Sequence, residues 1–338
     1  MIRIHLFIYF IFFFLTFLSA QEQYATPKPG EGITTFLERH GRPSKTYYRS
    51  FLQMNKQKLH GKKELRIGVK YLLPPLQGAE SSSRQSSQTG GQRVVREPLF
   101  GKKQAEIQPV GQSLKGACFY VVSGHGGPDP GAIGKMGHKK LHEDEYAYDV
   151  ALRLARQLLL EGAEVHIIIQ DAKDGIRDDA YLKNSKRETC MGSPIPLNQT
   201  ARLQQRCTAI NNLYKKDRQR YKYCRAIFLH VDSRSRRAQT DVFFYHAPKS
   251  AQGERLATTM KRTFESKYGR HQPNRGFRGT VSERGLYVLL NATPVALFVE
   301  LGNIQNTFDQ RRFVIDSNRE ALARWMKDGF VADYKRYK

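Results

Sequence analysis

Four short apolar runs, each bounded by polar or small residues, restrict the folds open to this chain more than any other feature. They lie at residues 117–122, 165–169, 226–231 and 295–300. Short runs that are apolar throughout are typical of strands buried on both faces of a sheet. Helical spacing of apolar residues occurs at 145–161, between the first two runs, and at 318–330, after the last. This alternation predicts an α/β domain with a mostly parallel, twisted sheet flanked by helices.

The 338-residue chain divides into unequal parts. Residues 77–113 are rich in Ser and Gly and lose the apolar periodicity, which predicts a flexible linker. After it comes a large domain, 114–338, which contains all four apolar runs. Before it comes a small segment, 24–76, for which we expect a separate α+β module.

The small segment opens with Gly30-Glu31-Gly32-Ile33, continues through two apolar-periodic stretches and carries Asn55 ahead of a last strand. This order resembles a degenerate LysM module. The resemblance implies binding to the N-acetylglucosamine-containing glycan of the cell wall. An unrelated small α+β domain is the alternative that the residues leave open.

The N-terminus has the pattern of a secretory signal peptide. Arg3 and His5 precede an apolar run at 6–18, and small residues follow up to Ala20. A membrane anchor is the alternative, but the run is shorter than the roughly 20 residues that span a bilayer. We therefore expect residues 1–20 to be cleaved, and the mature protein to be exported without a membrane attachment.

Export would place the four cysteines, Cys118, Cys190, Cys207 and Cys224, in an oxidising compartment. Four cysteines allow three full pairings, and sequence alone does not select among them. A local bridge such as Cys190 to Cys207 is one pairing that the spacing allows. The sequence has no CxxC spacing, which argues against a structural zinc site built from thiolates.

The formal net charge of +25 would by itself suggest a nucleic-acid partner. The basic residues are spread along the chain, however, and no nucleic-acid-binding motif accompanies them. A basic surface that adheres to an anionic cell envelope explains the charge equally well. We therefore expect no nucleic-acid partner.

Reactive side chains follow three of the four apolar runs. His125 follows the first run in a glycine-rich stretch, His230 lies in the third, and Glu300 ends the fourth. Ligands bind at the carboxyl ends of strands in open α/β sheets. We therefore expect two histidines and a glutamate to meet at one edge of the sheet.

Several motifs in a fixed order carry a family resemblance. They are GHGGPDPGA at 124–132, Glu143, LQQR at 203–206, LHVDS at 229–233, ELG at 300–302 and Asn306. Together they resemble the zinc-dependent N-acetylmuramoyl-L-alanine amidases of the type 3 family, over nearly all of 117–334. The resemblance implies hydrolysis of the amide bond between the lactyl group of N-acetylmuramic acid and L-alanine. It also implies peptidoglycan as partner and the periplasm or cell envelope of a bacterium as location.

The resemblance implies a Zn²⁺ ion held by His125, Glu143 and His230. Three protein ligands leave a fourth position open for water, as in catalytic zinc sites. Glu145 and His142 stand beside Glu143 and can also reach a metal, but the match of the following helix to the family's apolar helix sets a register that favours Glu143. The resemblance makes Glu300 the catalytic residue, which takes a proton from the attacking water and returns it to the leaving nitrogen.

Further residues within the motifs are expected to bind substrate or support the ligands. They are Asp129, Arg206, Asp232 and Asn306. Two positions depart from the family pattern. Asn303 replaces an aromatic residue after Glu300, and Val122 stands where an aspartate usually orients the first histidine. A carboxylate that orients His125 is therefore either missing or supplied from elsewhere.

Residues 171–195 form a long polar segment with several aspartates and Arg177. Their spacing lacks the calcium-binding loop pattern, so we expect a surface loop. If the protein is regulated, this loop is the candidate.

Three other functions compete with the amidase. A zinc peptidase acting on the stem peptide would use the same kind of ligands, but the sequence has no HExxH motif. A catalytically inactive peptidoglycan-binding protein is disfavoured because all four key residues are present. The third alternative, a secreted basic nuclease, is supported by the net charge alone.

Overall fold

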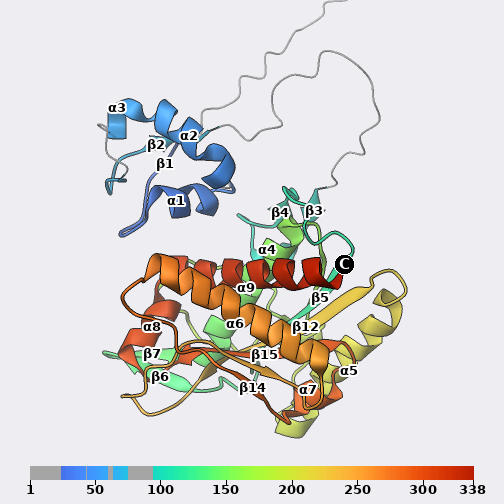
Figure 1. Cartoon of the computed structure of the whole chain (residues 1–338). Helices are drawn as coiled ribbons and strands as arrows, with labels where there is room; N and C mark the ends of the chain where they lie inside the picture. Colours follow the sequence, from blue (N-terminus) through green and yellow to red (C-terminus); the bar gives the residue numbers. More distant parts are fainter. Residues whose placement is uncertain (1–23, 43, 60–63, 75–93) are drawn as a thin grey trace, which may run out of the picture. The chain divides into compact units, whose positions relative to one another are not determined.

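The computed structural model describes residues 24–42, 44–59, 64–74 and 94–338. The chain splits into two compact units, one within residues 1–89 and one within 90–338 (Figure 1). The expected signal peptide lies outside the described residues. Among the residues that are described, no helix is long and apolar enough to cross a membrane.

The first unit is a small α+β module, as predicted. Its elements are β1 (Tyr24–Ala25), α1 (Ile33–Arg39), α2 (Ser44–Met54), α3 (Lys56–Leu59) and β2 (Tyr71–Leu72). β1 and β2 pair antiparallel, and the rings of Phe36, Phe51 and Tyr71 pack between the helices and strands. Asn55 is buried and fixes β2, because its side chain accepts from the N–H of Leu72 and donates to the Leu72 carbonyl, each at 2.8 Å.

The boundary of the predicted linker is wrong on its C-terminal side. Within 94–113 the chain forms β3 (Val95–Arg96), the 3-10 helix η1 (Pro98–Phe100) and β4 (Glu106–Ile107). Phe100 and Ile107 are each only 1% exposed and belong to the core of the second unit. These two apolar side chains anchor a stretch whose composition is otherwise polar. The rest of the expected linker lies mostly outside the described residues.

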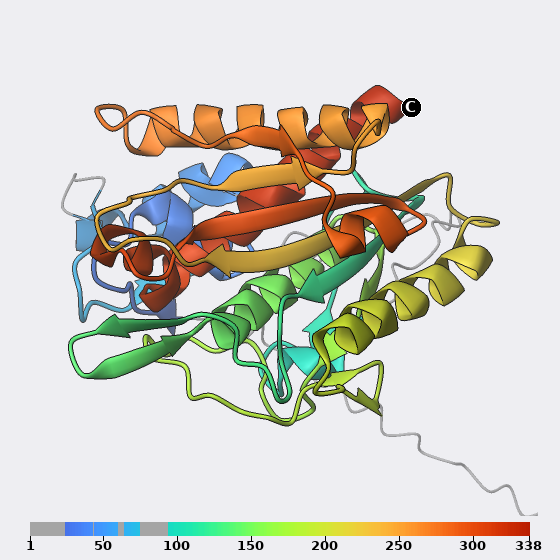
Figure 2. The same ribbon diagram turned by 90° about the horizontal axis from the view of Figure 1, so that it is seen from below.

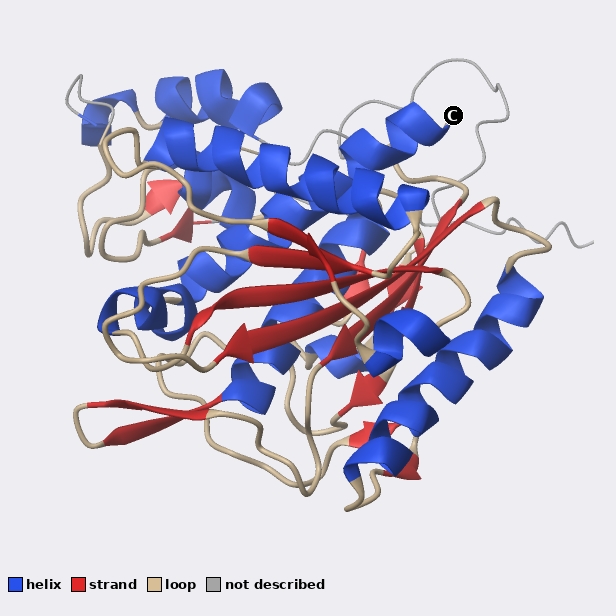
Figure 3. Ribbon diagram, turned by 60° about the horizontal axis from the view of Figure 1, so that its bottom comes forward, coloured by secondary structure: helices blue, strands red, loops and turns tan. Residues whose placement is uncertain are grey.

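The second unit is built on a six-stranded sheet with the order β14-β13-β15-β12-β5-β8 (Figure 3). Its strands are β5 (Ala117–Ser123), β8 (Glu164–Ile167), β12 (Tyr223–Asp232), β13 (Phe243–His246), β14 (Val281–Glu283) and β15 (Val295–Asn303). Neighbours among β8, β5, β12 and β15 are parallel, and only β13 pairs antiparallel, with β15. The predicted mostly parallel sheet is confirmed.

Both faces of the sheet are covered, which explains why its strands are apolar throughout. Phe119 and Val121 face a core that includes α4 (Glu143–Leu160), α6 (Ala251–His271) and α9 (Asp316–Tyr337). Tyr120 and Val122 face the other core, with α5 (Gln199–Asp217) and α7 (Tyr287–Asn291). Figure 2 shows the sheet between these two helical layers. The helices predicted at 145–161 and 318–330 are α4 and α9.

Shorter elements surround the sheet. They are the hairpin of β6 (Ile133–Met136) and β7 (Lys139–His142), the small sheet of β9 (Ile169–Gln170), β10 (Thr189–Cys190) and β11 (Ser193–Pro194), and α8 (Thr307–Val314). The run predicted as one strand at 165–169 is divided, because the chain leaves the main sheet after Ile167 and pairs with β10.

All four cysteines are buried, unpaired thiols. The suggested Cys190 to Cys207 bridge is therefore not formed. Burial raises the pKa of both thiols. Both belong to the apolar core beneath α5 and pack there as small hydrophobic residues.

A buried ion network fixes α4 against α9. The Asp149 carboxylate and the Arg319 side chain are both fully buried, 2.6 Å apart, and Arg153 donates to the same oxygen at 2.7 Å. The other oxygen accepts from the N–H of Arg177 at 2.8 Å. Burial alone would raise the pKa of Asp149, but the two guanidinium charges outweigh it and lower the pKa. The network fixes the helix that begins with Glu143.

We expect Asp149→Ala to lower the free energy of unfolding by about 3–5 kcal/mol, because the fully buried Arg319 guanidinium loses the carboxylate paired with it and Arg153 loses one of three. Urea denaturation followed by circular dichroism measures this. The control is Glu265→Ala, which breaks the exposed pair with Lys261 and should cost about 1 kcal/mol or less. Equal effects of the two substitutions would contradict the assigned role.

Candidate active site

Two histidines and a glutamate converge at the carboxyl edge of the sheet. His125 follows β5, His230 lies near the end of β12, and Glu143 is the first residue of α4. Glu143 Oε1 is 3.2 Å from His125 Nε2 and 3.0 Å from His230 Nδ1. One atom from each residue lies within 4.8 Å of the other two, so the group can hold a metal ion.

Glu145 points away from this group. Its carboxylate lies 2.8 Å from the Arg177 guanidinium and accepts from the N–H of Ser185. Residues two apart on a helix project to roughly opposite sides, about 200° apart. The structure therefore brings Glu143 to the histidines, as the helix register predicted, and uses Glu145 to hold the 171–195 segment.

Glycines leave room for the converging side chains. A Cβ atom on Gly124 would lie 2.3–2.6 Å from the His230 ring, and one on Gly131 would lie 2.7 Å from Glu143 Oε2 and 2.8 Å from the His125 ring. His125 itself has a φ of 59°, a conformation that costs a non-glycine residue roughly 1–3 kcal/mol. The glycine-rich stretch after β5 is thus a packing requirement of the site.

Asp129 supplies the carboxylate that Val122 cannot. Its Oδ2 is 2.9 Å from His125 Nδ1 and 2.6 Å from Arg202 Nη2, and its Oδ1 accepts from the N–H of Gly131. A carboxylate on one ring nitrogen orients the imidazole and leaves the other nitrogen free to bind a metal. Burial lowers the pKa of His125, but Asp129 and Glu143 outweigh it and raise the pKa to about 10.

Glu300 lies beside the group on the neighbouring strand. It is the register partner of His230 across the parallel pairing of β15 and β12. Its Oε2 is buried without a hydrogen-bond partner among the described residues. Burial, together with the negative charges of Glu143 and Asp232, raises the pKa of Glu300 well above its usual range. This carboxylate therefore gains and loses its proton at a higher pH than an ordinary glutamate does.

The four remaining predicted residues have different environments. Arg206 is buried and donates to the backbone carbonyl of His125, and burial lowers its pKa to about 10. Asp232 forms an ion pair with Arg234 at the rim of the site. Its negative charge helps to raise the pKa of Glu300. Asp129 is described above.

The Asn306 side chain bonds within the fold. Its side-chain oxygen accepts from the N–H groups of Phe308 and Asp309 and caps α8, while its amide donates to the Arg236 carbonyl. These bonds give Asn306 a structural role at the start of α8, and its suggested part in binding substrate or supporting the ligands stays a prediction. Motif position alone could not separate a helix cap from a ligand contact.

A pocket opens beside the histidines. Its polar lining includes His125, Asp129, Arg202, Arg206 and His230, and its apolar lining includes Leu286, Tyr287, Val288 and Phe298. The sequence did not single out Arg202 or the α7 residues. Arg202 stands one helical turn before Arg206 on α5, and this spacing was the available signal.

The segment 171–195 is partly interior, which corrects the prediction of a surface loop. Asp171 and Glu188 are buried. Glu188 Oε2 accepts from the N–H of Gly127 at 2.8 Å, and its Oε1 accepts from the Ser185 hydroxyl at 2.7 Å. The segment thus holds the glycine-rich stretch after β5. Its suggested part in regulation stays a prediction.

Fold and site define an α/β protein with a candidate metal centre of two histidines and one glutamate. Residues 120–331 match the family model described as N-acetylmuramoyl-L-alanine amidase. Because the match spans more than half of the 338 residues, the chain belongs to this family. No curated protein matches the chain in sequence.

Solved structures of amidases are similar to the chain. An N-acetylmuramoyl-L-alanine amidase from Clostridium difficile 630 has 19% identity and a TM-score of 0.46, with 64% of this chain and 95% of that chain covered. One of Nostoc punctiforme has 17% identity and a TM-score of 0.46, with 66% and 99% covered. One from Mycobacterium abscessus has 16% identity and a TM-score of 0.45, with 65% and 100% covered.

Glu300 should destabilise the metal-free fold at neutral pH. Its folded pKa lies above the ordinary 4.5, so ionisation opposes folding. Stability is full at pH values below the pKa of the unfolded side chain, falls as pH rises from there to the folded pKa, and stays low above it. In the presence of a chelator, we expect Glu300→Gln to have a higher free energy of unfolding than the parent at pH 7, because the amide has no charge to bury. The gain should vanish near pH 4. Denaturant unfolding at both pH values measures it, and a gain independent of pH would contradict it.

Proposed function

We infer that the chain is a zinc-dependent N-acetylmuramoyl-L-alanine amidase. It hydrolyses the amide bond between the lactyl group of N-acetylmuramic acid and the L-alanine of the stem peptide. The observation that carries the proposal is the convergence of His125, Glu143 and His230 at one edge of the sheet, with Glu300 on the next strand. Family membership supplies the choice of bond.

The residues present fit Zn²⁺. Two imidazoles and one carboxylate are a usual donor set for catalytic zinc, and three protein ligands leave a position for water. His125 Nε2 and His230 Nδ1 both face the same Glu143 oxygen. Asp129 fixes the tautomer of His125 that would leave Nε2 unprotonated.

When bound, Zn²⁺ would polarise the scissile carbonyl and lower the pKa of water. Glu300 accepts the proton of the attacking water and returns it to the leaving nitrogen. Its buried setting and raised pKa suit both transfers, because the carboxyl holds a proton more readily than an exposed glutamate. Arg206 steadies the backbone at His125, and the apolar wall of Tyr287 and Phe298 limits water in the pocket.

The first unit and the N-terminus complete the proposal. The order of strand, helices and strand in 24–76 supports a LysM-like module that binds the glycan. Residues 1–20 would direct export to the periplasm or cell envelope. The net charge of +25 favours adhesion to an anionic wall.

Digestion of purified murein tests the activity. We expect the chain to release stem peptides with a free N-terminal L-alanine, identified by mass spectrometry, and a chelator to abolish the release. Glu300→Ala should reduce the rate by about 10²–10⁴-fold, because proton transfer is lost. Glu254→Ala, which removes an exposed carboxylate on α6, is the matched control and should keep the parental rate.

Two results would overturn the assignment. Cleavage inside the stem peptide would favour the peptidase. Binding to murein without release of any product would favour a catalytically inactive peptidoglycan-binding protein.

Asp129→Asn tests how the ligands are oriented. We expect its Kd for Zn²⁺ to rise about 10–100-fold, because the amide no longer fixes His125. Competition with a chromophoric chelator measures the Kd. Asp179→Asn, at an exposed position in the 171–195 segment, should leave the Kd unchanged. Unaltered affinity in Asp129→Asn would contradict the orienting role.

A further inference from the structure

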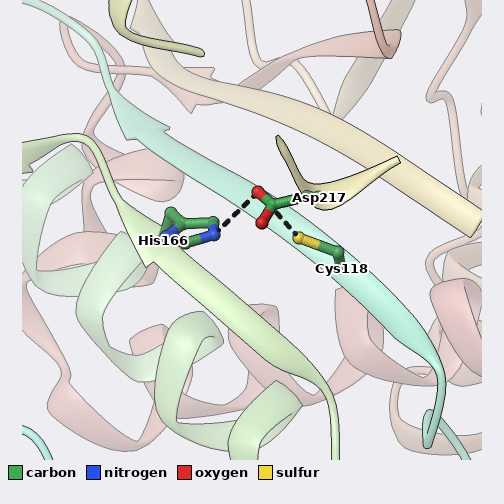
Figure 4. A group of neighbouring side chains, drawn as sticks. All are labelled: Cys118, His166 and Asp217. Atoms are coloured by element: carbon green, nitrogen blue, oxygen red, sulfur yellow. Dashed lines mark hydrogen bonds and ion pairs between the residues drawn. The ribbon is translucent and has the colours of Figure 1, made fainter. Parts of the chain in front are cut away.

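A second cluster of metal-ligating side chains lies at the other end of the sheet. Cys118 is near the start of β5, His166 lies in the edge strand β8, and Asp217 is the last residue of α5 (Figure 4). Six residues of strand and turn lie between Cys118 and His125, a span of roughly 20 Å. The cluster is therefore separate from the candidate active site.

The ligand atoms already lie close together. His166 Nε2 is 2.9 Å from Asp217 Oδ2, and Cys118 Sγ is 3.7 Å from the same oxygen. One atom from each residue lies within 4.8 Å of the other two. Cys224 is the register partner of Cys118 on β12, so its side chain lies on the same face of the sheet beside Cys118. Three donors thus surround one point, and a shift of the Cys224 side chain would add a fourth.

Protein contacts leave one ligand atom of this cluster without an aligned hydrogen bond and place a carboxylate at the end of a helix. His166 Nε2 is buried and makes no hydrogen bond among the described residues, although it is close to Asp217. The Tyr120 hydroxyl and the Cys118 thiol both donate to that same Asp217 oxygen. Asp217 also ends α5, where the helix dipole disfavours a carboxylate. A cation between the three side chains would remove each of these costs.

The donor set selects the metal. Thiolate, imidazole and carboxylate together are ligands of Zn²⁺, with bonds of about 2.0–2.3 Å. Tetrahedral geometry then requires ligand atoms roughly 3.3–3.8 Å apart. The separations of 2.9 and 3.7 Å reach this range with shifts of a few tenths of an ångström.

We propose that Cys118, His166, Asp217 and Cys224 form a second, structural Zn²⁺ site that joins β5, β8, β12 and the end of α5. Four protein ligands close the coordination sphere, so the site has no position for a reacting water. The ligands are far apart in sequence, so a site of this kind is possible in a chain without a CxxC motif. The site does not depend on the proposed amidase activity.

Cobalt substitution tests the site with a signal that only thiolates produce. The full chain, reduced and stripped of metal, is titrated with Co²⁺ while thiolate-to-Co²⁺ charge-transfer absorption is followed. The candidate active site has no sulfur ligand, so it is silent in this measurement. We expect the band to saturate by two equivalents of Co²⁺, because the candidate active site also takes up the ion, and we expect Zn²⁺ to bleach it.

Substitution of the proposed ligands shows which side chains produce the absorption band. Cys118→Ser should remove at least half of the absorption, and His166→Gln should weaken Co²⁺ binding at least tenfold. Cys207→Ser removes a buried thiol outside the cluster and should keep the band. His166 is partly exposed, so His166→Gln tests the site even if Cys118→Ser fails to fold.

Metal counting separates this site from the active site. Native mass spectrometry of a His125→Ala, His230→Ala double variant should find one bound Zn²⁺ per chain, and adding His166→Gln should remove it. Absence of the band in the folded parent chain would overturn the proposal, as would its persistence in Cys118→Ser. A Cys118–Cys224 disulfide in chain isolated without reductant would also overturn it, because both thiolates would be consumed.

Discussion

The parallel pairing of β5, β12 and β15 is the constraint on which the site depends. Because the three strands run in one direction, His125, His230 and Glu300 arrive at the same edge of the sheet. Each strand is packed on both faces, so a slip of one residue would turn every side chain to the wrong layer. The register that buries the core therefore also sets which reactive groups meet.

The site gathers negative charge that the surrounding structure must hold in place. The negative charges of Glu143 and Glu300 repel each other, and two partly buried histidines contact Glu143. Outside this group, Asp149 locks α4 to α9, and Glu188 holds the stretch after β5. Rigid supports around a strained centre are expected where function opposes stability.

The same strands present chemistry at both ends. At their carboxyl ends the donors are histidine and carboxylate with a pocket beside them, which suits a reacting metal. At the opposite end Cys118 and Cys224 are register partners near His166 and Asp217, so this donor set includes thiols. The two ends of one sheet thus carry clusters with different donor atoms.

The sequence by itself determined the α/β class, four of the six strands of the main sheet and the convergence of His125, His230 and Glu300, because apolar runs and their ends encode burial and direction. Matching the helix after Glu143 to the family pattern selected that residue. Tertiary structure decided the rest, since these contacts join residues distant in the chain. Examples are the contact of Asp129 with the His125 ring and the capping of α8 by Asn306.

Other outcomes also needed the fold. Phe100 and Ile107 pack in the core. The C-terminal end of the predicted linker is therefore folded, although its composition indicated no structure. Cys190 and Cys207 stayed unpaired, while Cys118 came to lie opposite Cys224. Proximity of this kind is set by packing and strand register, which spacing along one chain does not specify.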